Sequence, residues 1–252
     1  MNRIKALLLG VALSGAALSA SAASTYLFDN PENKTYFGAR VGVDISSAAN
    51  GGGFYSNSPG FSLGAVYNIP VFMNLYFEPG LGIFYNTIGA NYWDSFTQEV
   101  TNEATGVVEE VDVPYQIDGS IRNFGFRIPL LIGYHFDFTE DIKVNVFTGP
   151  QLNLSLVSRY HQNEVRVQDN EEAAWSTSVF GSQGFKHADL QWKFGVGISY
   201  QKYYLDLSGS WGMTKIMSKP DMSDEAIDDL DFSYTRRDIR RNLFSITLGY
   251  NF

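Results

Sequence analysis

The chain of 252 residues contains no cysteine, only three histidines and few charged residues. The lack of cysteine excludes disulfide frameworks, thiolate metal sites, cysteine nucleophiles and lipidated cysteines. Charged residues make up 18% of the chain and the net charge is −9. No stretch is rich in lysine and arginine, so nucleic acid is not an expected partner.

Long apolar runs are also scarce, and the one at the amino terminus has the features of an export signal. Arg3 and Lys5 precede an apolar run over residues 6–18, and Ala20, Ser21 and Ala22 follow it. Such a run is too short for a membrane-spanning helix, and the small residues suit a signal peptidase. We expect residues 1–22 to be a cleaved signal peptide and residues 23–252 to form one exported domain.

Aromatic residues (15%) and 24 glycines are abundant, and this composition favours strands. Eight segments alternate apolar residues with small or polar ones, the period of a strand with two different faces. They cover residues 36–45, 61–69, 74–86, 123–136, 142–156, 189–200, 203–213 and 244–252. In a soluble sandwich or lipocalin-like barrel the apolar face would be the core, whereas in an outer-membrane barrel it would face lipid.

The connections and aromatic positions favour the lipid-facing alternative. Short connections near residues 71–74, 137–141 and 201–202 alternate with long ones near residues 48–59, 89–119, 159–186 and 217–241. The sequence therefore predicts an all-β fold, an eight-stranded antiparallel up-and-down transmembrane β-barrel with short periplasmic turns and long extracellular loops. Outward aromatic residues fall near both ends, as interfacial girdles do: Phe37, Tyr67, Phe136, Tyr200, Tyr203, Tyr250 and Phe252 at one end, and Tyr85, Phe124, Trp192 and Trp211 at the other.

The inward face carries charges of both signs. An eight-stranded barrel is only wide enough for side chains to fill, so these charges are expected to pair in a polar network. The expected members are Arg40, Asp44, Glu78, Arg127, Lys143, Lys193 and Asp206. The functional alternative to this structural network is a proton or ion path through the same residues.

Catalysis would have to use the histidines. His135 is expected to form hydrogen bonds inside the lumen, and His161 lies in a long loop. His187 and Asp189 share one strand face, at a spacing where a carboxylate can orient an imidazole. No nucleophile is paired with them in the sequence, so we expect no catalytic residue and no enzyme.

The long loops carry acidic and basic clusters. Val107, Val108, Val111 and Val113 suggest that residues 89–119 extend the strands as a hairpin. Acidic residues are common in loops exposed to water, and this alone can explain the acidic clusters. The functional alternative is a calcium or magnesium site shared with lipid phosphates. The run over residues 221–231 does not match an EF-hand loop, so no metal ion and no cofactor are expected. The arginines could hold lipid phosphates or pair with the first acidic group. The clusters comprise Glu109, Glu110, Asp112, Asp228, Asp229, Asp231, Arg236, Arg237, Arg240 and Arg241.

The last strand ends with Tyr250 and a terminal Phe252, which resembles the C-terminal assembly signal of outer-membrane β-barrel proteins. With the signal peptide, the eight strands and the loop asymmetry, the chain resembles the small outer-membrane barrels called PorT-like. This resemblance implies a location in the cell outer membrane and insertion by the barrel assembly machinery. One PorT-like branch is associated with protein secretion, a role that barrel shape alone does not transfer.

We therefore expect a structural or surface-binding outer-membrane protein that acts through its extracellular loops. The expected partners are the lipid bilayer and lipopolysaccharide, and the extracellular ligand is not identified. An accessory role in outer-membrane protein secretion is the first alternative. A lipid-modifying enzyme at the outer rim is the second.

Overall fold

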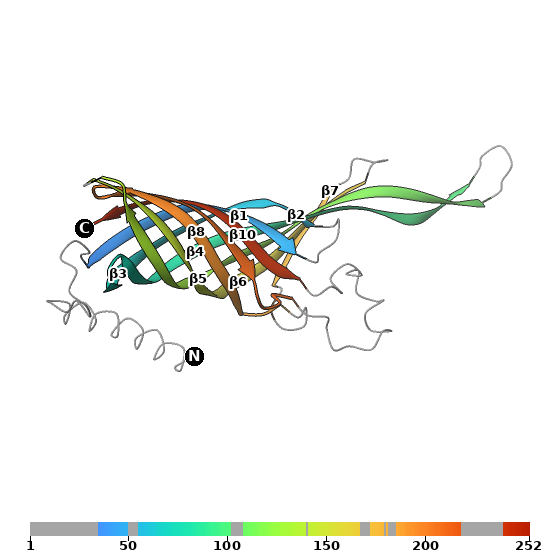
Figure 1. Ribbon diagram of the computed structural model, residues 1–252. Coiled ribbons are helices and arrows are strands. Elements are labelled where there is room, and N and C mark those ends of the chain that lie inside the picture. Colours follow the sequence, from blue (N-terminus) through green and yellow to red (C-terminus); the bar gives the residue numbers. More distant parts are fainter. Residues whose placement is uncertain are drawn as a thin grey trace, which may run out of the picture.

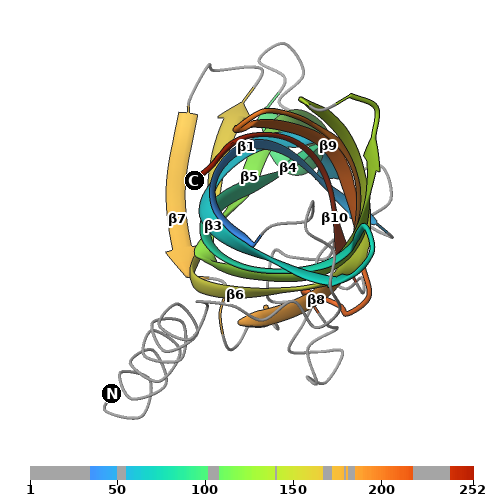
Figure 2. The ribbon, with the colours of Figure 1, turned by 60° about the vertical axis from the view of Figure 1, so that its left-hand side comes forward.

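Eight strands of the computed structural model close into an antiparallel barrel (Figure 2). The structure describes residues 35–49, 55–101, 108–139, 141–166, 172–178, 180, 185–217 and 239–252, so the expected signal peptide lies outside the described residues. The barrel strands are β1 (Tyr36–Ala49), β3 (Ser58–Phe72), β4 (Leu75–Thr101), β5 (Val108–Asp137), β6 (Ile142–Arg166), β8 (Ala188–Tyr200), β9 (Tyr203–Gly212) and β10 (Arg240–Asn251). Two shorter strands, β2 (Tyr55–Ser56) and β7 (Glu172–Ser178), pair with β4 and β6.

Each barrel strand pairs with its neighbours in the chain, and β1 pairs with β10 to close the ring. The closing seam runs from Gly38 opposite Asn251 to Ala49 opposite Arg240 without a register shift. The predicted eight-stranded up-and-down topology is confirmed.

Exposure alternates along the barrel strands, as two-faced strands require. On β1, the Val43 side chain is 59% exposed on the outer wall, whereas the next residue, Asp44, is completely buried inside. The predicted girdle residues Phe37, Tyr203 and Phe252 are exposed at the periplasmic end, and Trp192 and Trp211 are exposed toward the other end. No helix in the described part of the chain is long and apolar enough to cross a bilayer.

The periplasmic turns are short, as predicted. Two residues, Met73 and Asn74, connect β3 to β4, and Gln201 and Lys202 connect β8 to β9. Met73 and Gln201 adopt φ values of 47° and 52°. Positive φ is the conformation that lets a two-residue turn match the twist of its strands. The termini of the barrel and these turns therefore share one end.

At the other end, β4, β5 and β6 continue past the barrel (Figure 1). β4 and β5 stay paired as far as Thr101 and Val108, which confirms the hairpin expected from the valines. β6 extends to Arg166 and pairs there with β7. We call residues 91–101 of β4 and 108–118 of β5 the arm. The expected loops at 89–119 and 159–186 thus contain long strands.

Candidate functional site: the filled lumen and the extracellular arm

The lumen contains three layers of side chains. Near the periplasmic turns, Tyr76, Leu131 and Phe147 form a buried cluster. Charged side chains occupy the middle of the barrel. At the extracellular mouth lies a second buried cluster, called here the mouth cluster, made of Ile88, Ile121, Tyr160, Phe185, Ile216, Met217 and Ile239.

One buried ion pair joins β5 to β1. Arg127 Nη1 lies 2.9 Å from Asp44 Oδ2, and the Asp44 side chain is fully buried. Ser245 donates to the other Asp44 oxygen at 2.6 Å. The Asn86 side-chain amide has a partner for both its nitrogen and its oxygen in one orientation. In that orientation the nitrogen donates to Asp44 and the oxygen accepts from Arg127, each at 3.2 Å. Buried charges need such partners because removing them from water is costly.

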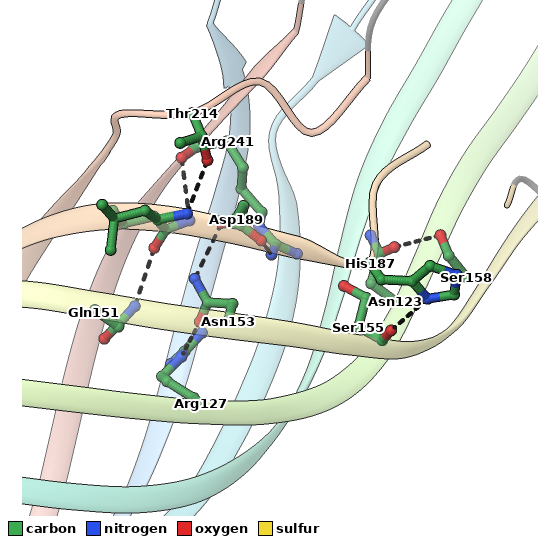
Figure 3. Close-up of polar contacts among 12 residues, drawn as sticks. Asn123, Arg127, Gln151, Asn153, Ser155, Ser158, His187, Asp189, Thr214 and Arg241 are labelled. Atoms are coloured by element: carbon green, nitrogen blue, oxygen red, sulfur yellow. Dashed lines mark hydrogen bonds and ion pairs between the residues drawn. The ribbon is translucent and has the colours of Figure 1, made fainter. Parts of the chain in front are cut away.

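A second ion pair lies closer to the mouth and is linked to the first (Figure 3). Arg241 on β10 donates to Asp189 Oδ1 on β8, and both side chains are buried. Asn153 donates to Asp189 Oδ2 at 3.1 Å and accepts from Arg127 Nε at 3.1 Å. The Phe84 ring lies between the arginines, 5.3 Å from Arg127 Cζ and 5.2 Å from Arg241 Cζ. One continuous network therefore crosses the lumen.

A third group of contacts lies beside the closing seam. Arg40 donates to Asn251 Oδ1 at 2.8 Å, which links the side chains of β1 and β10. Its guanidinium lies 3.7 Å from Glu78 Oε2 and 4.2 Å from the centre of the Tyr204 ring. Tyr36 also donates to Glu78, at 3.3 Å. These contacts give the seam a polar connection in addition to its backbone ladder.

A small cavity of about 70 Å³ lies between these groups. Its charged lining residues are Arg40, Arg127, Lys193, Asp44, Glu78 and Asp206. Six of the seven residues expected in the lumen network thus lie together, with three charges of each sign. A cavity of this size holds a few water molecules, which is far from a diffusion pore.

Lys143 and His135 lie nearer the periplasmic end. Lys143 Nζ contacts Asp137 Oδ1 at 3.4 Å, and both side chains are about one third exposed, so this pair lies apart from the network. His135 Nδ1 contacts Asn145, and its ring stacks on Tyr76 with centroids 4.1 Å apart. Asn145 in turn donates to Ser199 at 2.9 Å. His135 therefore forms the lumen hydrogen bond expected of it.

The two members of the candidate catalytic pair bind different partners. His187 contacts the Ser155 carbonyl oxygen at 3.2 Å and stacks on Phe180 at 3.8 Å. One carboxylate oxygen of Asp189 accepts a hydrogen bond from Arg241, and the other accepts one from Asn153. His161 lies opposite Ser120 on the extension of β6, where burial lowers its pKa and repulsion from Arg122 and Arg159 lowers it further. The arrangement does not present an imidazole oriented by a carboxylate.

One expectation for the loop clusters is wrong. Arg241 does not lie above the outer leaflet, because it is buried within the lumen and bound to Asp189. Glu110 and Asp112 lie opposite Glu99 and Thr97 across the arm, and Glu109 lies opposite Val100. Their pairing with Arg236 or Arg237 stays a prediction, because both arginines lie outside the described residues. Arg240 is half-buried opposite Ala49, and Asp228, Asp229, Asp231, Arg236 and Arg237 lie outside the described residues.

The base of the extended strands carries a different pair of arginines. Arg122 on β5 and Arg159 on β6 are register partners, and both are exposed. Arg122 lies two residues beyond the outward girdle residue Phe124. A surface hollow beside Arg122 is also lined by Phe61 and Tyr85. Cationic side chains therefore lie at the outer interface of the barrel, next to aromatic rings.

The arm beyond this base has the opposite charge. Residues 91–118 contain seven Asp and Glu and no Lys, Arg or His. Among the described residues, no group of three His, Asp or Glu side chains is arranged to hold a metal ion. The arm thus carries carboxylates beyond the two arginines at its base.

Comparisons with known proteins give one family and several similar structures. A family model described as "Outer membrane protein beta-barrel domain" matches residues 22–218. The comparison with curated proteins finds no match.

Similar solved structures include the attachment invasion locus protein Ail of Yersinia pestis, in complex with the heparin analogue sucrose octasulfate. It is 13% identical, with 87% of this chain and 99% of that chain covered and a TM-score of 0.38. Neisserial surface protein A is 11% identical, with 86% and 97% covered and a TM-score of 0.36. A major outer membrane protein from Thermus thermophilus is 14% identical, with 86% and 99% covered and a TM-score of 0.39.

Proposed function

This chain belongs to the outer membrane protein beta-barrel domain family, and on that premise we propose that it is a non-enzymatic surface-binding protein that acts through its extracellular strand extensions. The observation that supports this role is the contrast between the two parts of the molecule. The lumen is filled by ion pairs and covered by the mouth cluster. The arm, in contrast, projects from the barrel (Figure 1), and side chains on both of its strands, such as Val100 and Val111, are exposed. Function on a barrel scaffold commonly lies in such projections.

Export and assembly are part of the same proposal. Residues 1–22 would direct secretion and be removed. The outward Phe252 ring, which is 68% exposed and packs against Tyr250, would be read by the barrel assembly machinery in a PorT-like manner. The accessory role in protein secretion stays a prediction.

Attachment of whole cells to coated beads tests the role of the arm. The variant replaces residues 92–117 with an Asn-Gly turn, because Asn91 and Asp118 are register partners that such a turn can join. The beads carry polylysine, dextran sulfate or alkyl chains. We expect the shortened protein to lose most of its attachment to polylysine beads, since the replaced residues 92–117 contain six carboxylates and no Lys, Arg or His.

The control for this experiment is the barrel itself. Both proteins should show the same mobility shift between unboiled and boiled samples on a gel, because the arm lies outside the barrel wall. Equal attachment of both proteins to all three kinds of bead would contradict a surface-binding role for the arm.

We also propose that the base of the extended strands binds lipopolysaccharide phosphates through Arg122 and Arg159, in place of the arginines expected from the sequence. An arginine near an anionic membrane surface contributes about 1 kcal/mol. Replacing both with glutamine should therefore weaken lipopolysaccharide binding by about thirtyfold. Titration of purified protein with lipopolysaccharide measures this, with Lys143→Gln at the periplasmic end as the control. Unchanged affinity in the double variant would overturn this assignment.

A further inference from the structure

The tip of the arm is a two-stranded ribbon with an open edge. β2 reaches β4 only at Gly89 and Ala90, and β6 reaches β5 only as far as Tyr115. Within the part of the chain that the structure describes, residues 96–101 of β4 pair with β5 on one side and with no strand on the other. The backbone groups along such an edge can accept an additional strand.

The two faces of this ribbon differ chemically. On one face, Glu99 lies opposite Glu110 and Thr97 lies opposite Asp112, with a 3.0 Å hydrogen bond from Thr97 to Asp112. On the other face, Gln98 lies opposite Val111, and Val100 lies opposite Glu109. Val100 is 45% exposed and Val111 is 39% exposed. The first face therefore carries three acidic residues, whereas the second carries one, Glu109, and exposes two valines.

The acidic face contains an unfavourable contact. Like charges placed directly opposite each other on neighbouring strands destabilise the pair, and Glu99 and Glu110 are such partners. Because residues 91–118 contain no Lys, Arg or His, no side chain of the arm can offset this repulsion. A cationic side chain of another molecule, placed over the acidic face, would relieve it.

Of the two edges, that of β4 is the better template. The β5 edge carries Pro114, which has no N–H group, together with Glu109, Glu110 and Asp112. Proline and charges are the features that protect an edge from strand addition. Residues 96–101 of β4 contain one charge and no proline.

We propose that the β4 edge over residues 96–101 binds an extended segment of a protein partner in which Lys or Arg alternates with Val, Ile or an aromatic residue. The alternation follows from strand geometry, because successive side chains of an added strand point to opposite faces. Basic residues would then lie beside Glu99, with side chains long enough to reach across β4 toward Glu110, and apolar residues would lie beside Val100. This inference rests on the proposed surface-binding function and specifies the partner of the same arm.

Peptide binding to the purified full-length protein tests this proposal. The probes are a labelled eight-residue peptide that alternates Lys and Val, and a peptide of the same composition with four Lys followed by four Val. Fluorescence anisotropy should show that the alternating peptide binds at least about tenfold more tightly. Two further versions carry N-methyl groups on either the odd or the even residues. Only one of them should lose binding, because alternate N–H groups of an added strand face the edge.

Variants of the arm complete the test. Glu99→Gln with Glu110→Gln should weaken the alternating peptide by at least about fivefold. The control is Asp141→Asn, at the periplasmic end, which should have no effect. Equal affinity for the two Lys–Val peptides, or equal loss with both methylated versions, would overturn strand addition. If the arm still mediates attachment to polylysine beads, the surface-binding role stands even when strand addition fails. If the arm contributes neither to bead attachment nor to peptide binding, both proposals fail.

Discussion

Arg127→Met should lower the free energy of unfolding by about 3–5 kcal/mol, because it leaves a buried carboxylate without its ion-pair partner. Asp44 is fully buried, and Arg127 Nη1 is 2.9 Å from it. The change also removes the bond from Arg127 to Asn153, through which the first ion pair is linked to the Asp189–Arg241 pair. Urea titration of the protein in vesicles, followed by the folded band on unboiled gels, measures the loss.

A double variant separates the uncompensated charge from lost packing. Asp44→Leu with Arg127→Met removes both charges, and replacing a buried ion pair with apolar residues is often close to neutral. The double variant should therefore be more stable than Arg127→Met alone. As a matched control, Lys143→Met breaks a pair that is about one third exposed, and such pairs contribute at most about 1 kcal/mol. Equal stability of Arg127→Met and the wild-type protein would mean that the network does not hold the lumen together.

The barrel could be predicted from the sequence because a lipid-facing strand needs strict alternation. Val43 and Asp44 are adjacent and lie on opposite sides of the wall, and a period of two is enough to assign each of them. Short turns such as Gln201–Lys202 then identified the periplasmic end. These features depend only on neighbours in the chain.

The pairing inside the lumen could not be predicted in the same way. Arg241 and Asp189 are 52 residues apart, and alternation gives the face of a side chain but not its partner. The interpretation of Arg241 as a lipid contact failed because the last strand begins earlier than expected, at Arg240. Extending the predicted alternation of the last segment by three residues, from Phe244 to Arg241, would have placed Arg241 inside. The alternation also places Phe84 on the polar face, but nothing in the sequence indicates that its ring lies between Arg127 and Arg241.

Alternation also breaks where a strand bulges. The β5–β6 register shifts between Phe124 and Gly125, and on β6 the consecutive residues Leu156 and Val157 are both exposed. A bulge inserts one residue and exchanges the two faces beyond it. Tyr160 consequently joins the mouth cluster and Arg159 faces outward. Nothing in the local sequence of this predicted loop marked that change.

Closure of β1 against β10 is the central feature of the account, and a disulfide across this seam should form only in the register described. Ile45 and Phe244 are direct partners with outward side chains that are 45% and 47% exposed. Cα atoms of such partners are about 4.5–5.5 Å apart, within the range of a disulfide. Because the chain has no other cysteine, Ile45→Cys with Phe244→Cys can form only this bond within one molecule.

The measurement is the mobility of this variant on boiled gels with and without reductant, beside a control in which Ile45→Cys is combined with Ile246→Cys. The control pair shares the outer face but is two residues out of register, about 7–8 Å apart. The account predicts that the first variant migrates faster without reductant, since the bond joins the first and last barrel strands, and that the control does not. A bond in the control alone, or in neither variant, would contradict the closed eight-stranded barrel.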